Sequence, residues 1–177
     1  DRTSRGLGDV YKRQAEERVV REVSSTESNL EKIGGSISVS SFQNGMEKEK
    51  MLDGSNRTFW HSRFKPTLAK PPHYVILENP NARVIDGLSY ATWSGGNGNG
   101  QIQAYSVFLS DDGQNWGESI IDGNLEIRLA NEQFNHFPQT TNKKYIKFLV
   151  TKAHSIDGRS LASIGRLDVL TLSLIHI

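Results

Sequence analysis

An all-β domain, folded as a β-sandwich or barrel, is the fold class that the sequence predicts for residues 36–171. Apolar residues recur at every second position in several short segments, which places them on one face of a strand. Asp-Gly and Asn-Gly pairs separate these segments, and such pairs favour tight turns. The chain has no sustained amphipathic helix, no GxGxxG motif and no phosphate-binding loop. Many short strands between frequent turns are typical of sandwiches and barrels.

The expected strands can be followed in order along the chain. Each is recognised by alternating or continuous apolar residues: Ile37 with Val39, residues 74–77, residues 105–109, residues 145–150, and Leu167 with Val169. The turns between them are expected at Asp53-Gly54, Asp86-Gly87, Asn97-Gly98, Asn99-Gly100, Asp112-Gly113 and Asp122-Gly123. Glycine tolerates a positive φ there, and Asp or Asn bonds back to the local backbone.

The two ends of the chain are interpreted as translated sequencing adapter. One codon choice for residues 9–14 has a reverse complement that translates as Leu-Ser-Leu-Ile-His-Ile, which is the sequence of residues 172–177. We therefore exclude residues 1–14 and 172–177 from fold reasoning, as for any expression scar. Residues 15–171 are then a natural segment of a longer gene, whose signal peptide would not be visible. Residues 15–35, rich in Glu, Arg and Ser, are interpreted as a linker or the edge of a preceding domain.

Composition limits the function classes. The adapter segments hold four of the 21 Lys and Arg residues and two of the 20 Asp and Glu residues, which leaves 17 basic and 18 acidic residues. This balance gives no basic face of the kind that nucleic-acid binding needs, so we expect no nucleic-acid partner. No apolar run approaches the roughly 20 residues of a membrane-spanning helix. The absence of cysteine excludes disulfides and thiolate chemistry.

Five segments, in this order, resemble the discoidin family, also called the coagulation factor V/VIII type C family. They read LDGSNRTFWHS at 52–62, PHYVIL at 72–77, YSVFLSDDGQNW at 105–116, KYIKF at 144–148 and ASIGRLDV at 162–169. The resemblance implies an eight-stranded jelly-roll β-sandwich of the galactose-binding-like type, with binding loops at one end. It further implies a non-catalytic module that binds a glycan or polysaccharide and is covalently attached to a secreted enzyme. The expected location is therefore extracellular or periplasmic.

Trp93 and His61 are the first two candidate ligand-binding residues. Trp93 lies in a polar, glycine-rich loop, where an exposed ring could stack on the apolar face of a sugar or simply cover the rim. His61 corresponds to a ligand-binding histidine of the family; the alternative is an imidazole satisfied by a neighbouring backbone group. Galactose binders of the family often carry an arginine near the position of Trp93. Residues 92–94 read Thr-Trp-Ser here, and this departure from the family pattern puts galactose itself in doubt.

Four further polar residues complete the candidate site. Asn97 and Asn99 could donate amide hydrogen bonds, or could serve turn geometry. Gln43 matches a polar first-loop position of the family. Arg159, in the last long loop, could reach a hydroxyl or carboxylate, or could be a solvated surface arginine. Leu161 falls where relatives often have an aromatic residue.

A structural calcium, common in the family, is not expected here. The matching positions are Asp53, Ser55 and Thr58, with Arg166 where the family has a glutamate. Calcium prefers six to eight oxygen ligands, several of them charged. We therefore expect no cofactor, and we hypothesise that the Arg166 guanidinium fills the metal's place and pairs with nearby carbonyls or with Asp53.

Two other functions are weighed against glycan binding. A protein- or lipid-docking discoidin domain needs exposed apolar residues with basic neighbours, and no Lys or Arg lies between Tyr90 and Tyr105. A catalytic jelly-roll domain finds little support, because the histidines lack metal-ligand spacing and the Asp111-Asp112 pair precedes a turn glycine.

Two tryptophans in family motifs, Trp60 and Trp116, are expected to pack in the core.

Overall fold

The computed structural model describes residues 27–128 and 131–172. The adapter interpretation of residues 1–14 and 173–177 lies outside the described residues, as does most of the expected linker. Leu172, the first residue of the second adapter segment, follows the last strand directly.

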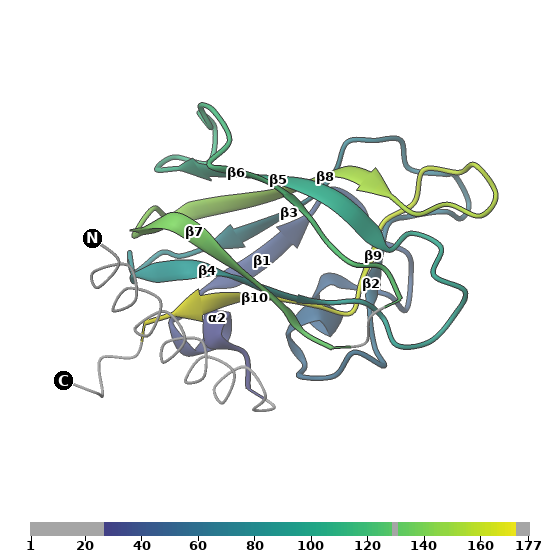
Figure 1. Ribbon diagram of the computed structural model, residues 1–177, viewed down its shortest axis with the longest axis horizontal. Helices are drawn as coiled ribbons and strands as arrows, with labels where there is room; N and C mark the ends of the chain where they lie inside the picture. The colour runs from purple at the N-terminus through teal and green to yellow at the C-terminus, as the bar shows by residue number, and fades with distance from the viewer. Residues whose placement is uncertain (1–26, 129–130, 173–177) are drawn as a thin grey trace, which may run out of the picture.

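Eight strands in the described ranges form two antiparallel sheets (Figure 1). The larger sheet has the order β1 (Ser36–Val39), β3 (His73–Glu78), β8 (Tyr145–Ala153), β5 (Ile102–Ser110) and β6 (Ile121–Asn124). The smaller sheet has the order β10 (Arg166–Thr171), β4 (Ile85–Ala91) and β7 (Gln133–Thr141). A separate ladder pairs β2 (Trp60–His61) with β9 (Ser163–Ile164). The predicted eight-stranded sandwich is confirmed.

The core lies between the two sheets, where alternate residues of each strand are buried. In β3, Val75 and Leu77 are fully buried while their neighbours are partly exposed. Across the sandwich, the ring of Tyr90 on β4 stacks on Phe148 of β8 at 6.5 Å, and Phe148 stacks on Tyr105 of β5 at 4.8 Å. Burying one such side chain contributes roughly 1.5–3 kcal/mol, so this layer dominates the stability of the domain.

The domain begins earlier than residue 36. The short helix α2 (Asn29–Lys32) packs on β10, and Leu30 is fully buried in the core. The backbone N–H groups of Asn29 and Leu30 donate to the carboxylate of Asp168, both at 2.9 Å. The interpretation of residues 28–35 as linker or foreign domain edge is therefore wrong. Their polar composition hid the segment, because its apolar contacts with the core come from only two side chains, the buried Leu30 and the partly buried Ile33.

The two tryptophans expected in the core differ. Trp60 is fully buried, and its indole N–H donates to the carbonyl oxygen of Ser41 at 2.9 Å. Trp116 is only partly buried, with the Lys147 ammonium 5.4 Å from its ring. The expectation for Trp116 was wrong. Trp116 lies in the segment between β5 and β6, where an amphipathic ring can cover a surface lysine instead.

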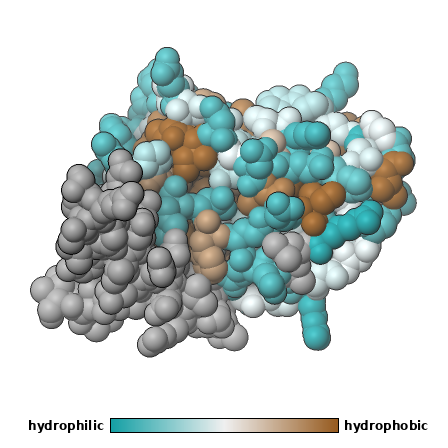
Figure 2. All heavy atoms as spheres, in the orientation of Figure 1, coloured by the Kyte–Doolittle hydropathy of each residue, from teal (hydrophilic) through white to brown (hydrophobic). Residues whose placement is uncertain are grey.

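The two ends of the sandwich have different characters. Figure 1 shows α2 and the end of β10 at one end, and the loops that follow β2, β4 and β8 at the other. We call these loops, residues 62–72, 92–101 and 154–162, the rim. Figure 2 shows a mostly hydrophilic surface with small, separate hydrophobic patches. Among the described helices, none has the length and apolar character needed to cross a bilayer.

Candidate functional site

Hydrogen bonds between the three loops hold the rim together. Gly100 N–H donates to the carbonyl of His154, and His154 N–H donates to the carbonyl of Gln101, both at 2.7 Å. Ser62 N–H donates to the carbonyl of Ala162 at 2.8 Å, which ties the first loop to the third. Because the loops brace one another, side chains that they carry have defined positions.

His61 is largely buried at the base of the rim, and its protonation state follows from its contacts. Nδ1 lies 2.7 Å from the carbonyl oxygen of Ser62, and a carbonyl can only accept, so Nδ1 carries the proton. Desolvation lowers the pKa of His61 below its usual value, and the nearby charge of Arg159 acts in the same direction. The ring is therefore neutral at pH 7. Nε2, which has no partner among the described residues, presents a lone pair.

Aromatic rings flank His61 and form a continuous row. Phe64 meets the imidazole edge-on at 4.9 Å, Phe59 meets it edge-on at 6.4 Å, and Phe59 stacks on Trp93 at 3.8 Å. We call Trp93, Phe59, His61 and Phe64 the aromatic row. Sequence reasoning missed Phe59 and Phe64, although their spacing from His61, two residues before and three after, was a readable signal.

Trp93 is less open than its polar loop predicted. One face of the indole is covered by Phe59, and the backbone of Gly96 approaches the ring so closely that a β-carbon there would lie 2.5 Å from Cζ3. Gly96 is thus required by packing as well as by its positive φ of +75°. Stacking of a sugar on Trp93 stays a prediction, restricted to what this packing leaves exposed.

The asparagines serve the backbone through their oxygens. Asn97 Oδ1 accepts from the N–H of Asn99 at 3.0 Å, and Asn99 Oδ1 accepts from the N–H of Ile156 at 3.2 Å. The turn role weighed for one of them therefore holds for Asn97, while Asn99 links two loops. Both side-chain amide nitrogens lack a partner within the described ranges, so ligand donation by either stays a prediction.

Gln43 and Arg159 also have protein partners. Gln43 Oε1 accepts from the N–H groups of Phe64 and Lys65, each at 2.9 Å, so Gln43 positions the segment that carries Phe64. Arg159 forms a partly exposed ion pair with Asp157 at 2.8 Å. Such pairs are worth about 0–1 kcal/mol, so the guanidinium can exchange this partner for a ligand.

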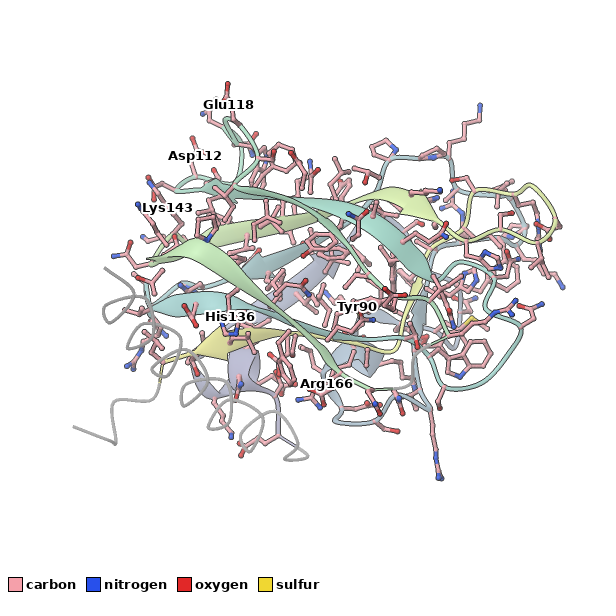
Figure 3. All side chains as sticks on the ribbon, viewed as in Figure 1. Tyr90, Asp112, Glu118, His136, Lys143 and Arg166 are labelled. Atoms are coloured by element: carbon pink, nitrogen blue, oxygen red, sulfur yellow. The ribbon has the colours of Figure 1, made fainter. Side chains whose placement is uncertain are left out.

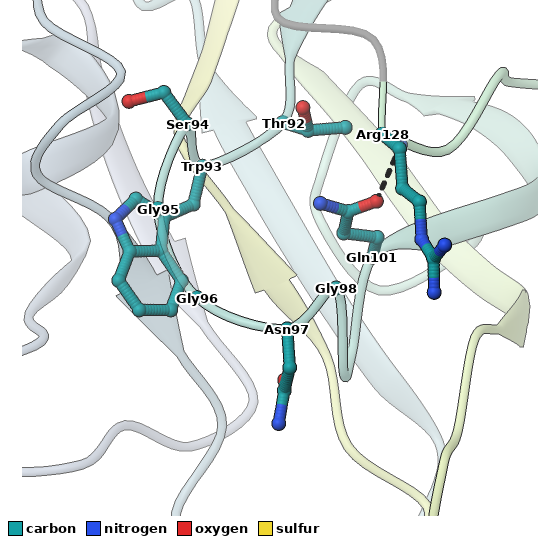
Figure 4. Close-up of a pocket in the computed structure, with 9 residues that line it drawn as sticks. All are labelled: Thr92, Trp93, Ser94, Gly95, Gly96, Asn97, Gly98, Gln101 and Arg128. Atoms are coloured by element: carbon teal, nitrogen blue, oxygen red, sulfur yellow. Dashed lines mark hydrogen bonds between the residues drawn. The ribbon is translucent and has the colours of Figure 1, made fainter.

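A pocket of about 490 Å³ lies beside the loop of residues 92–98 (Figure 4). It is lined by Thr92, Trp93, Ser94, Gly95, Gly96, Asn97, Gly98, Gln101 and Arg128. Arg128, which sequence reasoning missed, comes from the segment between β6 and β7, and its N–H donates to Gln101 Oε1 at 2.6 Å. No motif or periodic pattern marks residue 128, so sequence carried no signal for it.

The positions that match the calcium ligands of the family do not fit a metal here. Asp53 uses one carboxylate oxygen to accept from Ser55 N–H at 3.0 Å and the other to accept from the Thr58 hydroxyl. Arg166 lies elsewhere: its guanidinium is 3.5 Å from Asp168 and 3.8 Å from Glu132. The hypothesis that Arg166 pairs with Asp53 is wrong, because the buried carboxylate on its own strand is nearer. Among the described residues, no three acidic or histidine side chains are grouped for a metal.

Calcium is therefore expected to leave the thermal stability unchanged. A site with a Kd one hundredth of the calcium concentration would stabilise the fold by about 2.7 kcal/mol, which at this chain length raises Tm by about 5–10 °C. Because Asp53 is the one carboxylate among the matching positions and calcium prefers several charged oxygens, we expect Tm in 1 mM calcium and in EDTA to agree within about 1 °C. Differential scanning calorimetry measures this, and a rise of several degrees would contradict it.

The Asp111-Asp112 pair forms a turn, as its glycine suggested. Asp112 accepts from the N–H groups of Gln114 and Asn115 and from the Ser110 hydroxyl, all at 2.9 Å, and these bonds hold the pKa of its carboxyl well below the usual range. Asp111 pairs with the exposed Lys143 at 2.8 Å. Figure 3 places Asp112 and Lys143 at the end of the sandwich remote from the rim.

Comparison with known proteins gives consistent matches. A family model described as "F5/8 type C domain" matches residues 36–164. A galactose oxidase of Gibberella zeae is 31% identical over 131 residues, which cover 73% of this chain but 19% of the oxidase. The chain thus spans about a fifth of the length of that curated relative.

Two solved structures from Clostridium perfringens share the fold. One is the module CpGH89CBM32-5 in complex with GalNAc-β-1,3-galactose, with a TM-score of 0.65, 24% identity, and coverage of 78% of this chain and 97% of the module. The other is a family 32 carbohydrate-binding module in complex with galactose, with a TM-score of 0.64, 19% identity, and coverage of 81% and 97%.

Proposed function

The chain belongs to the F5/8 type C domain family, and on that premise we propose that residues 28–171 form a non-catalytic carbohydrate-binding module that recognises glycans at the rim. Two structures of the same fold hold galactose or GalNAc-β-1,3-galactose, which supports this assignment. Turn chemistry accounts for Asp111 and Asp112, the acidic pair weighed for catalysis.

The neutral imidazole of His61 beside Phe64 is the observation that carries the proposal. A sugar hydroxyl can donate to the lone pair on Nε2. The C–H face of the same sugar can then pack on the ring of Phe64, which lies beside the imidazole. A polar acceptor of fixed orientation next to an apolar ring is the combination from which shallow ligand sites gain specificity. The charge of Arg159 acts on His61, and Arg159 is the proposed source of a further hydrogen-bond donor to the same ligand.

The proposed role is to hold an attached enzyme at its substrate. Linking a binding module to a catalytic domain raises the effective substrate concentration, even though the module itself breaks no bond. For this role we propose an extracellular or periplasmic location. We further propose that the covalently attached partner is a glycoside hydrolase, a sialidase or a similar enzyme.

A second candidate, docking to a cell surface, is favoured by one observation on the segments around Phe42 and Leu68. Phe42 and Leu68 are 48% and 41% exposed, and a pocket of about 420 Å³ beside Phe42 is also lined by Arg63 and Lys65. Exposed apolar residues with basic neighbours are what such docking needs, and they lie on different loops from the one weighed in the sequence. Binding to vesicles containing anionic lipid, with no response on a glycan array, would favour this candidate.

His61→Ala is expected to weaken glycan binding about tenfold, because one hydrogen bond in a desolvated site is worth about 1.4 kcal/mol. A glycan array would identify ligands of the wild-type protein, and isothermal titration with the best of them would compare the variants. His61→Gln, which retains an acceptor, should lose less affinity. Lys143→Ala, at the remote end, is the control and should bind normally. Unchanged binding by folded His61→Ala would refute the role of His61.

The pH dependence of binding follows from the lowered pKa of His61. Nε2 is unprotonated at and above neutral pH, so affinity should change little between pH 8 and 7. Below that range, protonation replaces the lone pair with a donor and adds a charge near Arg159, so affinity should fall. Titrations at pH 7.5 and 5 measure the effect, which should be absent in His61→Ala. An equal acid loss in that variant would assign the effect to another group.

A further inference from the structure

Arg128 is an exposed cation whose side chain lines the edge of a pocket. Among the described residues that line the 490 Å³ pocket, it is the one charged side chain. The volume lies within the range of about 300–1,000 Å³ typical of small-molecule sites. Figure 4 shows the Arg128 side chain beside Gln101, with Trp93 on the other side of the lining. An ideal β-carbon on Gly98 would lie 3.6 Å from Arg128 Nε, so a larger residue at 98 would crowd it.

The backbone of Arg128 is held in an uncommon conformation. Its φ is +61°, in the left-handed region that non-glycine residues seldom adopt. The hydrogen bond to Oε1 of Gln101, a residue only 5% exposed, fixes this geometry. A position that a glycine would occupy at lower cost therefore carries an arginine, and its side chain lines the pocket.

The amides in the pocket offer donors and no acceptors. Asn97 Oδ1 is engaged by Asn99 N–H, and Gln101 Oε1 is engaged by Arg128 N–H. These bonds fix which end of each amide is oxygen, so their NH₂ groups are the ends left for a ligand. Neither NH₂ group has a partner within the described ranges, nor does the Arg128 guanidinium. By contrast, Arg159 and Arg166 both lie against carboxylates.

We propose that this pocket binds the carboxylate of an acidic sugar, a uronic or sialic acid residue, with Arg128 as the residue that selects it. A carboxylate is an acceptor without donors, which matches the guanidinium and the two NH₂ groups of the lining. The lining also includes Thr92 and Ser94, whose hydroxyl groups can donate as well as accept. The planar fork of arginine pairs with both oxygens of a carboxylate. Rings connect the pocket to His61 through Trp93 and Phe59, so a second sugar of the same chain can reach His61.

This inference rests on the proposed function and narrows it to anionic glycans. The test compares two probes by isothermal titration, a galacturonic acid trisaccharide and a neutral galactose trisaccharide. Wild type is compared with Arg128→Gln, which removes the charge and retains an amide. Arg83→Gln is the matched control, since it removes an exposed arginine from the turn between β3 and β4.

Wild type is expected to bind the acidic probe more tightly than the neutral one. Arg128→Gln should lose at least about tenfold in affinity for the acidic probe, since hydrogen bonds to charged groups are worth about 1.5–3 kcal/mol. Its affinity for the neutral probe should change less than twofold, and Arg83→Gln should bind both normally. Raising the salt concentration should weaken acidic-probe binding in wild type more than in Arg128→Gln.

The outcomes separate this inference from the proposed function. If wild type prefers the neutral probe, or if Arg128→Gln weakens both probes equally, the selection by Arg128 is refuted while glycan binding stands. If neither probe and no glycan on an array binds, the proposed function itself fails. A loss confined to the acidic probe supports the inference.

Discussion

Asp168→Ala is expected to destabilise the domain by about 3–5 kcal/mol, the usual effect of breaking a fully buried charge network. The Asp168 carboxylate is fully buried and accepts from the N–H groups of Asn29, Leu30 and Val169 and from the Ser28 hydroxyl. Arg166 lies 3.5 Å away. Burial raises the pKa of Asp168, and the N–H donors of Leu30 and Asn29 oppose that rise. Alanine would leave these donors without an acceptor, and Arg166 would keep only the more distant carboxylate of Glu132, at 3.8 Å.

Urea unfolding followed by circular dichroism measures the change in free energy. Asp168→Asn should also destabilise, because both oxygens accept from N–H groups and an amide would set an NH₂ against one of them. Asp111→Ala is the control, since its exposed pair with Lys143 is worth about 0–1 kcal/mol. Hydrogen exchange should show that α2 loses protection first. A loss below about 1 kcal/mol in Asp168→Ala would contradict the network.

Trp60→Ala is expected to cost about 3–5 kcal/mol, because it leaves a cavity in the core and removes the bond to Ser41. Trp116→Ala should cost much less, since that ring is partly exposed and its charged neighbour, the Lys147 ammonium, lies 5.4 Å from the ring centroid. The two variants form an informative comparison because the sequence motifs predict a core position for both tryptophans, whereas the structure buries only Trp60 completely. Chemical denaturation of both variants measures it, and equal losses would show that Trp116 is a core residue in solution.

The sheet was predictable from the sequence because alternation is a local property. Val75 with Leu77, and Ile146 with Phe148, are buried as their spacing requires. The helix α2 was not predictable, because four residues cannot form a stable helix alone and depend on an acceptor 138 residues away. Long-range contacts of this kind leave no periodic trace.

The candidate site was predictable only in part. The motif around residue 60 identified His61, and the structure adds its tautomer and the rings on either side. Gln43 was identified as a candidate ligand-binding residue, but its oxygen holds the Phe64 segment, a role that depends on how two loops meet. Arg128 was missed because one turn residue becomes part of a pocket only through packing against Gln101.

The placement of α2 beside the last strand has a practical consequence. Asn29 bonds to the carbonyl oxygen of Val169 at 3.2 Å, so residues near both described ends lie together, at the end of the sandwich away from the loops of the candidate site (Figure 1). A dye, bead or sensor surface attached near residue 27 or 172 would therefore leave those loops facing the solution. Immobilised protein should then have the same affinity as free protein, whichever of the two residues carries the anchor.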